Sequence, residues 1–92
     1  MGKAVITFKL MPESPDTNLE PIKEQAEKIA KDAGAIGAMR VLEEPIAFGL
    51  KAVMVMVMYE VEGADFDGIV AKMAELEGVI NAEVAKMDLA LG

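Results

Sequence analysis

The sequence contains no cysteine, no histidine and no tryptophan among its 92 residues. Without cysteine the chain can form no disulfide and offers no thiolate ligand to a metal. Without histidine it also lacks the commonest general base and the commonest imidazole ligand. A catalyst built from this chain would depend on carboxylates and lysines alone. We therefore expect no catalytic residues, no cofactor and no metal site.

Basic residues are scarce as well, because nine Lys and Arg stand against sixteen Asp and Glu, giving a net charge of −7. Nucleic-acid binders need a Lys and Arg surface for the phosphates, so this balance argues against one. It suits instead a soluble partner with basic patches. The apolar run around Met54 is too short to cross a bilayer, and no signal peptide precedes the first strand pattern. We expect a cytoplasmic protein.

The chain does contain enough apolar residues, 53%, for one small core, and we expect a single domain over residues 1–92. Period-two alternation predicts strands, three- and four-residue spacing predicts helices, and Pro and Gly mark the turns. Asn18 and Asp65 are the expected helix N-caps, and Gly34 and Gly78 the expected stops. The predicted strand, helix, strand, strand, helix and strand cover residues 3–10, 19–33, 35–44, 53–59, 66–77 and 79–87, with a loop over 11–17.

This order predicts an α+β fold, the ferredoxin-like βαββαβ sandwich, with two crossovers around a central hairpin. Its four strands form one antiparallel sheet. Each helix has a single apolar stripe, so both helices must cover the same face of the sheet. The other face stays open.

The strand over residues 53–59 alternates valine with methionine, and only one set can face the helices. The β-branched valines suit that packing, which leaves Met54, Met56 and Met58 on the open face. Two interpretations remain open for them. Either these side chains are buried, as part of the core or by self-association of two copies, or they form an adaptable surface that binds a partner.

The segment between the two central strands is unusual because Pro45, Ile46, Phe48 and Gly49 place an aromatic side chain within a turn. A hairpin needs no aromatic residue to turn. Phe48 either folds back on the sheet as a hydrophobic clip or is presented at the hairpin tip to a partner. Paired carboxylates such as Glu43 with Glu44 are expected on so acidic a chain, and no calcium, P-loop or zinc-protease motif accompanies them.

Three runs resemble the archaeal form of translation elongation factor 1-beta, the counterpart of the eukaryotic C-terminal exchange domain. They are Met11-Pro12-Glu13-Ser14, Glu44-Pro45-Ile46-Ala47-Phe48-Gly49-Leu50 and Glu77-Gly78-Val79, and the likeness extends from Gly2 to about Met87. It implies guanine-nucleotide exchange on the GTPase elongation factor 1-alpha and a ferredoxin-like fold. It also implies that Phe48 enters the GTPase, with Pro45 and Gly49 shaping its presentation.

Eukaryotic members of that family place a lysine close to the C-terminus, near the magnesium and phosphate region of the GTPase. This chain has Leu89 at the aligned position. Lys86 is the basic residue nearest to it and is the predicted substitute. The partner-binding residues expected from the resemblance are Pro45, Ile46, Phe48, Gly49 and Lys86.

Two other functions remain as alternatives. A ferredoxin-like small-molecule sensor or oligomerisation module would pair through Met54, Met56 and Met58, and the same three residues could support weak self-association of an exchange factor. A carboxylate-dependent enzyme in this scaffold is the third. Exchange makes and breaks no bond, so the absence of histidine and cysteine is compatible with it.

Overall fold

The computed structural model describes residues 2–90, so Met1, Leu91 and Gly92 of the predicted 1–92 domain lie outside the described residues. The predicted order of elements is confirmed. The elements are β1 (Lys3–Pro12), α1 (Leu19–Asp32), β2 (Ile36–Pro45), the 3-10 turn η1 (Ala47–Gly49), β3 (Lys51–Glu60), α2 (Phe66–Ala74) and β4 (Val79–Ala90).

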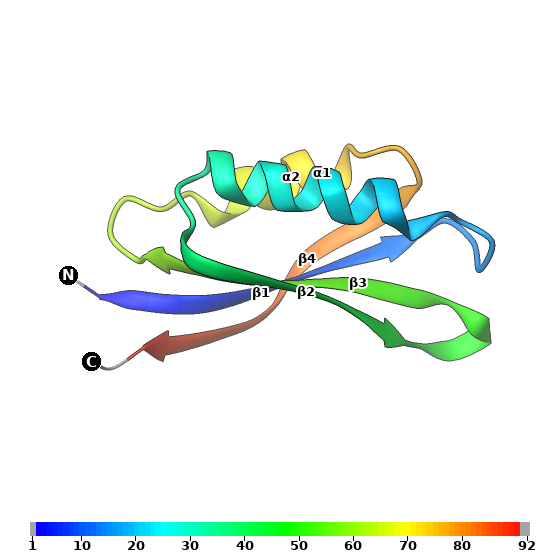
Figure 1. The fold of residues 1–92 in the computed structure, drawn as a ribbon, viewed down its shortest axis with the longest axis horizontal. Helices are drawn as coiled ribbons and strands as arrows, with labels where there is room; N and C mark the ends of the chain where they lie inside the picture. Colours follow the sequence, from blue (N-terminus) through cyan, green and yellow to red (C-terminus); the bar gives the residue numbers. More distant parts are fainter. Residues whose placement is uncertain (1, 91–92) are drawn as a thin grey trace.

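The strands form one antiparallel sheet in the order β2-β3-β1-β4. Both helices lie on the same face of this sheet, and the other face is left open (Figure 1). β1 begins and β4 ends at one end of the sheet, where Lys3 pairs with Ala90. The β2–β3 hairpin projects at the opposite end (Figure 1). The expected ferredoxin-like α+β fold is confirmed.

The core lies between the sheet and the helices. Alternate residues of β1 and β3 point into it, and the valines of β3 are buried whereas Met54, Met56 and Met58 are half-buried on the open face. The predicted division of β3 is therefore confirmed. The buried core residues of the other elements are Ala4, Ile6, Phe8 and Leu10 of β1, Ile22, Ala26 and Ala30 of α1, Ile69 and Met73 of α2, and Val79 and Ala82 of β4.

Both helices begin at the predicted caps. Asn18 accepts a hydrogen bond from the backbone N–H of Glu20, and Asp65 accepts one from that of Gly68. These bonds satisfy backbone donors that the first turn of a helix leaves unpaired. Among the described residues, no helix is long and apolar enough to cross a membrane.

Several predicted boundaries are wrong by one to three residues, including the start of β3, which lies at Lys51 rather than residue 53. Three of the differences have a clear physical reason. β1 continues through Pro12, because the proline stands at the end of the strand beyond a register shift, where its missing N–H costs little. α2 ends at Ala74, and a turn leads to Gly78, whose φ of 89° favours glycine. β4 is not short: it continues to Ala90 because its C-terminal half pairs with β1 back to Lys3.

Candidate functional site

The hairpin between β2 and β3 closes in a tight turn. Pro45 pairs with Lys51 at its base, and the N–H of Ile46 donates to the carbonyl oxygen of Leu50 at 2.8 Å. The N–H of Leu50 in turn donates to the carbonyl oxygen of Ala47 at 3.3 Å. Pro45 removes one backbone donor as the strand ends. The turn is thus held by backbone hydrogen bonds and does not need the side chain of Phe48 for its stability.

Phe48 at the tip of this hairpin is 93% exposed. Its φ of 63° and ψ of 28° lie in the left-handed region, and within residues 2–90 it is the only residue other than glycine with a positive φ. This conformation costs an L-residue about 1–2 kcal/mol. A hydrophobic clip would have buried the ring, so that interpretation is wrong. The ring is held in solvent by a backbone that would suit glycine better.

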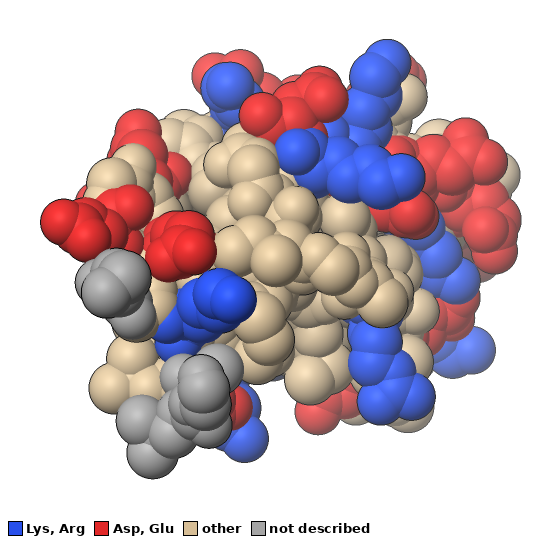
Figure 2. All heavy atoms as spheres, turned by 60° about the vertical axis from the view of Figure 1, so that its left-hand side comes forward, with Lys and Arg blue, Asp and Glu red and all other residues tan. Residues whose placement is uncertain are grey.

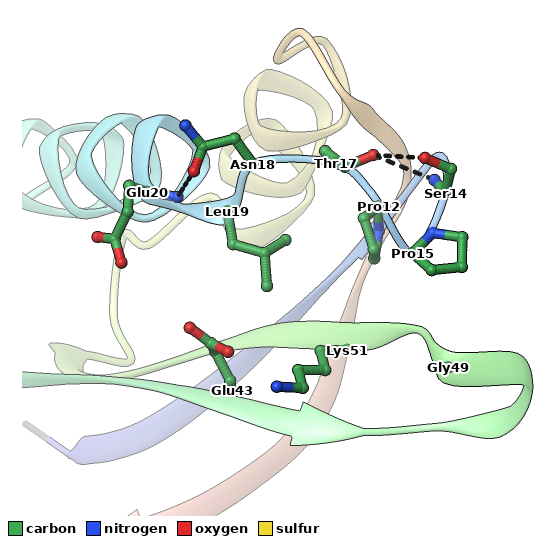
Figure 3. Close-up of a pocket in the computed structure, with 10 residues that line it drawn as sticks. All are labelled: Pro12, Ser14, Pro15, Thr17, Asn18, Leu19, Glu20, Glu43, Gly49 and Lys51. Atoms are coloured by element: carbon green, nitrogen blue, oxygen red, sulfur yellow. Dashed lines mark hydrogen bonds between the residues drawn. The ribbon is translucent and has the colours of Figure 1, made fainter.

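A hollow of about 280 Å³ separates the hairpin from the loop between β1 and α1 (Figure 3). Glu43 and Lys51 line it from the strands, and Leu19 lines it from the start of α1 (Figure 3). The loop wall is stiffened by the hydroxyl of Thr17, which accepts a hydrogen bond from the N–H of Ser14 at 3.1 Å. The remaining lining residues are Pro12, Pro15, Asn18, Glu20 and Gly49.

One ion pair crosses from α1 to the strand that leads into the hairpin. The ammonium of Lys23 contacts the Glu43 carboxylate, and lies 3.5 Å from that of Glu20. The hydrogen bond to Glu43 raises the pKa of Lys23, and the same bond holds the pKa of Glu43 below its usual value. Lys51 adds a further favourable charge on Glu43. Both partners are thus held in their charged forms.

Lys86 is not brought to the hairpin. It lies on β4 opposite Thr7, which pairs with Met56 on its other side. From Met56 the strand runs five residues back to Lys51, about 16 Å at about 3.3 Å per residue, before the turn begins. The Lys86 side chain is 68% exposed and forms an ion pair of 3.6 Å with Asp88. Pro45, Ile46, Phe48 and Gly49 do lie together in the hairpin.

The β1–α1 loop and Lys23 belong to this end of the molecule, and the predicted site did not include them. The β1–α1 loop lies close to the hairpin tip, since a Cβ added to Gly49 would stand 3.9 Å from the Cβ of Pro15. The sequence did indicate the loop, because the Met11-Pro12-Glu13-Ser14 run was one of the three segments that resemble the exchange family. The pairing of β1 with β3 carries this loop to the base of the hairpin.

Charge elsewhere is mixed. On the face shown in Figure 2, which includes the end opposite the hairpin, acidic and basic side chains surround an uncharged area. In the part of the chain that the structure describes, no cluster of three acidic residues is arranged to hold a metal ion.

The fold and the exposed aromatic define a small α+β domain with a protruding hairpin. Residues 5–90 match the family described as the EF-1 guanine nucleotide exchange domain. The chain is 38% identical to elongation factor 1-beta of Methanosphaerula palustris, over 97% of this chain and 99% of that protein. It is 39% identical to elongation factor 1-beta of Pyrococcus horikoshii, over 84% of each chain.

These matches cover nearly the whole chain at well over 30% identity, and a third relative, elongation factor 1-beta of Methanoregula boonei, is 38% identical over 97% of this chain and 99% of its own length. The chain therefore belongs to the EF-1 guanine nucleotide exchange domain family. The resemblance inferred from the hairpin and its two supporting runs is confirmed.

Proposed function

We propose that this protein promotes release of GDP from the translation GTPase elongation factor 1-alpha, and that Phe48 is the side chain it inserts into that GTPase. The observation that carries the proposal is the exposed ring of Phe48 in a left-handed backbone conformation, within a chain of the exchange family. Strained conformations that the fold maintains without local benefit cluster at functional sites. Here the benefit arises when the ring is buried in a partner.

Exchange follows from linkage. A factor that binds the nucleotide-free GTPase more tightly than the GDP-bound form must weaken GDP binding by the same ratio. A coupling of about 1–3 kcal/mol is typical, and burying one aromatic side chain is worth about 1.5–3 kcal/mol. The Phe48 ring is therefore large enough to supply a coupling of this size. No covalent step is needed, so the protein acts without being an enzyme.

The neighbours of Phe48 in the hairpin would serve the same contact. Pro45 and Gly49 shape the turn, since Gly49 also has a positive φ, 77°. Ile46 is half-buried and would support the base of the contact. These three residues would set the direction of the ring rather than supply the main contact energy.

Lys86 lies on the open face at a distance from the hairpin. Any contact that it makes with the GTPase would therefore be separate from the contact of Phe48. A single GTPase that reached both would have to extend along the sheet.

The acidic charge of the chain, −7, suits a partner with basic regions, and raising the salt concentration should slow association. A role in translation implies that the protein acts in the cytoplasm. We further propose that residues 1–92 form one exchange domain.

The test measures the release of a fluorescent GDP analogue from purified elongation factor 1-alpha, with the wild type and with Phe48→Ala. The proposal expects strong acceleration by the wild type and its loss in the variant. The control is Ile80→Ala, which removes a 69% exposed apolar side chain from β4 and should accelerate release as the wild type does. No acceleration by folded wild type, with a matched GTPase and magnesium, would overturn the proposed function.

A further inference from the structure

The hairpin that carries Phe48 is held to the body of the protein on few sides. β2 is an edge strand, so β3 is its only neighbour in the sheet. The hairpin extends past the helices (Figure 1), and the hollow of about 280 Å³ lies between it and the β1–α1 loop. A two-stranded hairpin is only marginally stable on its own. The backbone ladder alone therefore leaves the direction of the hairpin loosely determined.

The ion pair between Lys23 and Glu43 spans this weak point. Glu43 is two residues before Pro45, where β2 ends, and Lys23 lies in the first half of α1. The two side chains are only 22% and 33% exposed, so the pair is better shielded from solvent than the Lys86 pair, whose partners are 68% and 58% exposed. Shielding strengthens an ion pair and reduces its screening by salt.

The position of Glu43 in the sheet makes the contact directional. Glu43 pairs with Val53, which is buried beneath the helices, so its side chain points to the helix side of the sheet. Figure 3 shows this carboxylate directed from β2 toward Leu19 and Glu20 at the start of α1. The ion pair therefore fixes the distance between the helix and the base of the hairpin.

We propose that Lys23 and Glu43 are positioning residues for exchange: their ion pair joins α1 to β2 and sets the direction in which the hairpin presents Phe48. This inference rests on the proposed function. Without the pair, the hairpin samples other directions, and only a fraction of molecules present the ring correctly. Apparent affinity falls in proportion to that fraction, while the bound complex is unchanged.

The experiment titrates wild type, Lys23→Gln, Glu43→Gln and the double variant against elongation factor 1-alpha loaded with the fluorescent GDP analogue. Each single variant should raise the half-saturating concentration about two- to five-fold, the range of an ion-pair coupling at a surface. The maximal release rate should stay unchanged. The double variant should lose no more than one single variant, because the removed groups act as one pair.

Two control variants separate position from charge. Lys28→Gln removes the same charge from the exposed side of α1 and should leave both kinetic constants unchanged. Lys23→Arg keeps a cation that can bind the carboxylate and should restore the wild-type half-saturating concentration. Amide hydrogen exchange at Ile46 and Leu50, whose N–H groups close the turn, should quicken in both single variants and stay slow in Lys28→Gln and Lys23→Arg.

The outcomes are distinguishable. If wild type fails to accelerate release, the proposed function itself fails. If wild type accelerates release and Phe48→Ala does not, but the single variants keep the wild-type half-saturating concentration, the positioning role is wrong. Equal losses in Lys23→Gln and Lys28→Gln would likewise overturn it, since net charge would then explain the effect.

Discussion

The hydroxyl of Tyr59 on β3 donates a buried hydrogen bond of 2.8 Å to the backbone carbonyl oxygen of Ala30, near the end of α1. The tyrosine ring packs edge-on against Phe8 and Phe66, with ring centroids 6.3 and 5.7 Å away. One end of α1 is thereby fixed to the end of β3, one of the two inner strands of the sheet. Lys23 contacts Glu43 nearer the other end, so the helix is joined to the sheet at two places.

Replacing Tyr59 by phenylalanine should keep the ring packing and remove only this hydrogen bond. The carbonyl of Ala30 would lose a buried partner, so the free energy of unfolding should fall by about 1 kcal/mol. Urea denaturation followed by circular dichroism measures the change. An unfolding free energy equal to that of the wild type would show that the bond contributes nothing net to stability.

The same tyrosine predicts a pH dependence. Burial raises the pKa of Tyr59 from 10.0 to about 12. Above pH 10 the unfolded chain loses the phenolic proton while the folded chain keeps it, so stability should fall as pH rises from about 10 to about 12. Tyr59 is the single tyrosine and there is no tryptophan, so tyrosinate absorbance near 295 nm reports on it alone. A native midpoint equal to that in urea would contradict the prediction.

Much of this fold could be predicted from the sequence because its alternation is regular. The valines and methionines of β3 have opposite environments. Period two separated the two sets, and the β-branched shape of valine assigned the valines to the helix side. Boundaries were harder. Pro12 closes a strand although prolines are typical of loops, and the end of β4 depends on pairing with β1, which no local pattern encodes.

The local sequence pattern predicted the hairpin part of the site but not its ion pair. An aromatic within a turn can be singled out from residue type and position, and the exposure of Phe48 excludes the hydrophobic clip. The Lys23 and Glu43 contact joins residues twenty positions apart through the packing of α1 on β2. Such a contact depends on tertiary geometry, so neither residue type nor spacing could identify it. The binding roles of all five predicted residues stay predictions: Pro45, Ile46, Phe48, Gly49 and Lys86.

The backbone at Phe48 predicts an unusual stability result. Because the ring is 93% exposed, Phe48→Ala should change the free energy of unfolding by less than about 0.5 kcal/mol. Phe48→Gly should be at least as stable as the alanine variant, since glycine adopts a φ of 63° without strain. Thermal unfolding of the three proteins tests this order. A marked loss of stability in Phe48→Ala would mean that the ring packs on its own domain.

The ion pair at the hairpin predicts an effect of acid. The hydrogen bond from Lys23 lowers the pKa of Glu43 from its ordinary value of 4.5, so its contribution is present above that value and is lost as pH falls through the depressed pKa. The stability difference between wild type and Glu43→Gln should therefore shrink below pH 4.5. Urea denaturation at pH 6 and pH 3 measures it, with Glu24→Gln as the exposed control. A difference that stays constant would show that the pair does not stabilise the fold.

The open face of the sheet predicts weak self-association through Met54, Met56 and Met58. These side chains are half-buried. They pair with Lys9, Thr7 and Val5 of β1 and with Leu42, Arg40 and Ile36 of β2, so the methionine row is flanked by both polar and apolar residues. Two copies that stack there would bury methionine at the cost of bringing two charges of −7 together.

We expect a dissociation constant near 1 mM, about 4 kcal/mol of association free energy, and tighter association at higher salt because the repulsion is screened. Sedimentation equilibrium over a range of protein concentrations measures both. Met56→Lys should weaken association, whereas Val61→Lys, which changes a 38% exposed side chain beyond the end of β3, should not. A monomer at every concentration and salt would leave the methionine row to the GTPase or to solvent, and a dimer insensitive to Met56→Lys would place the contact on another surface.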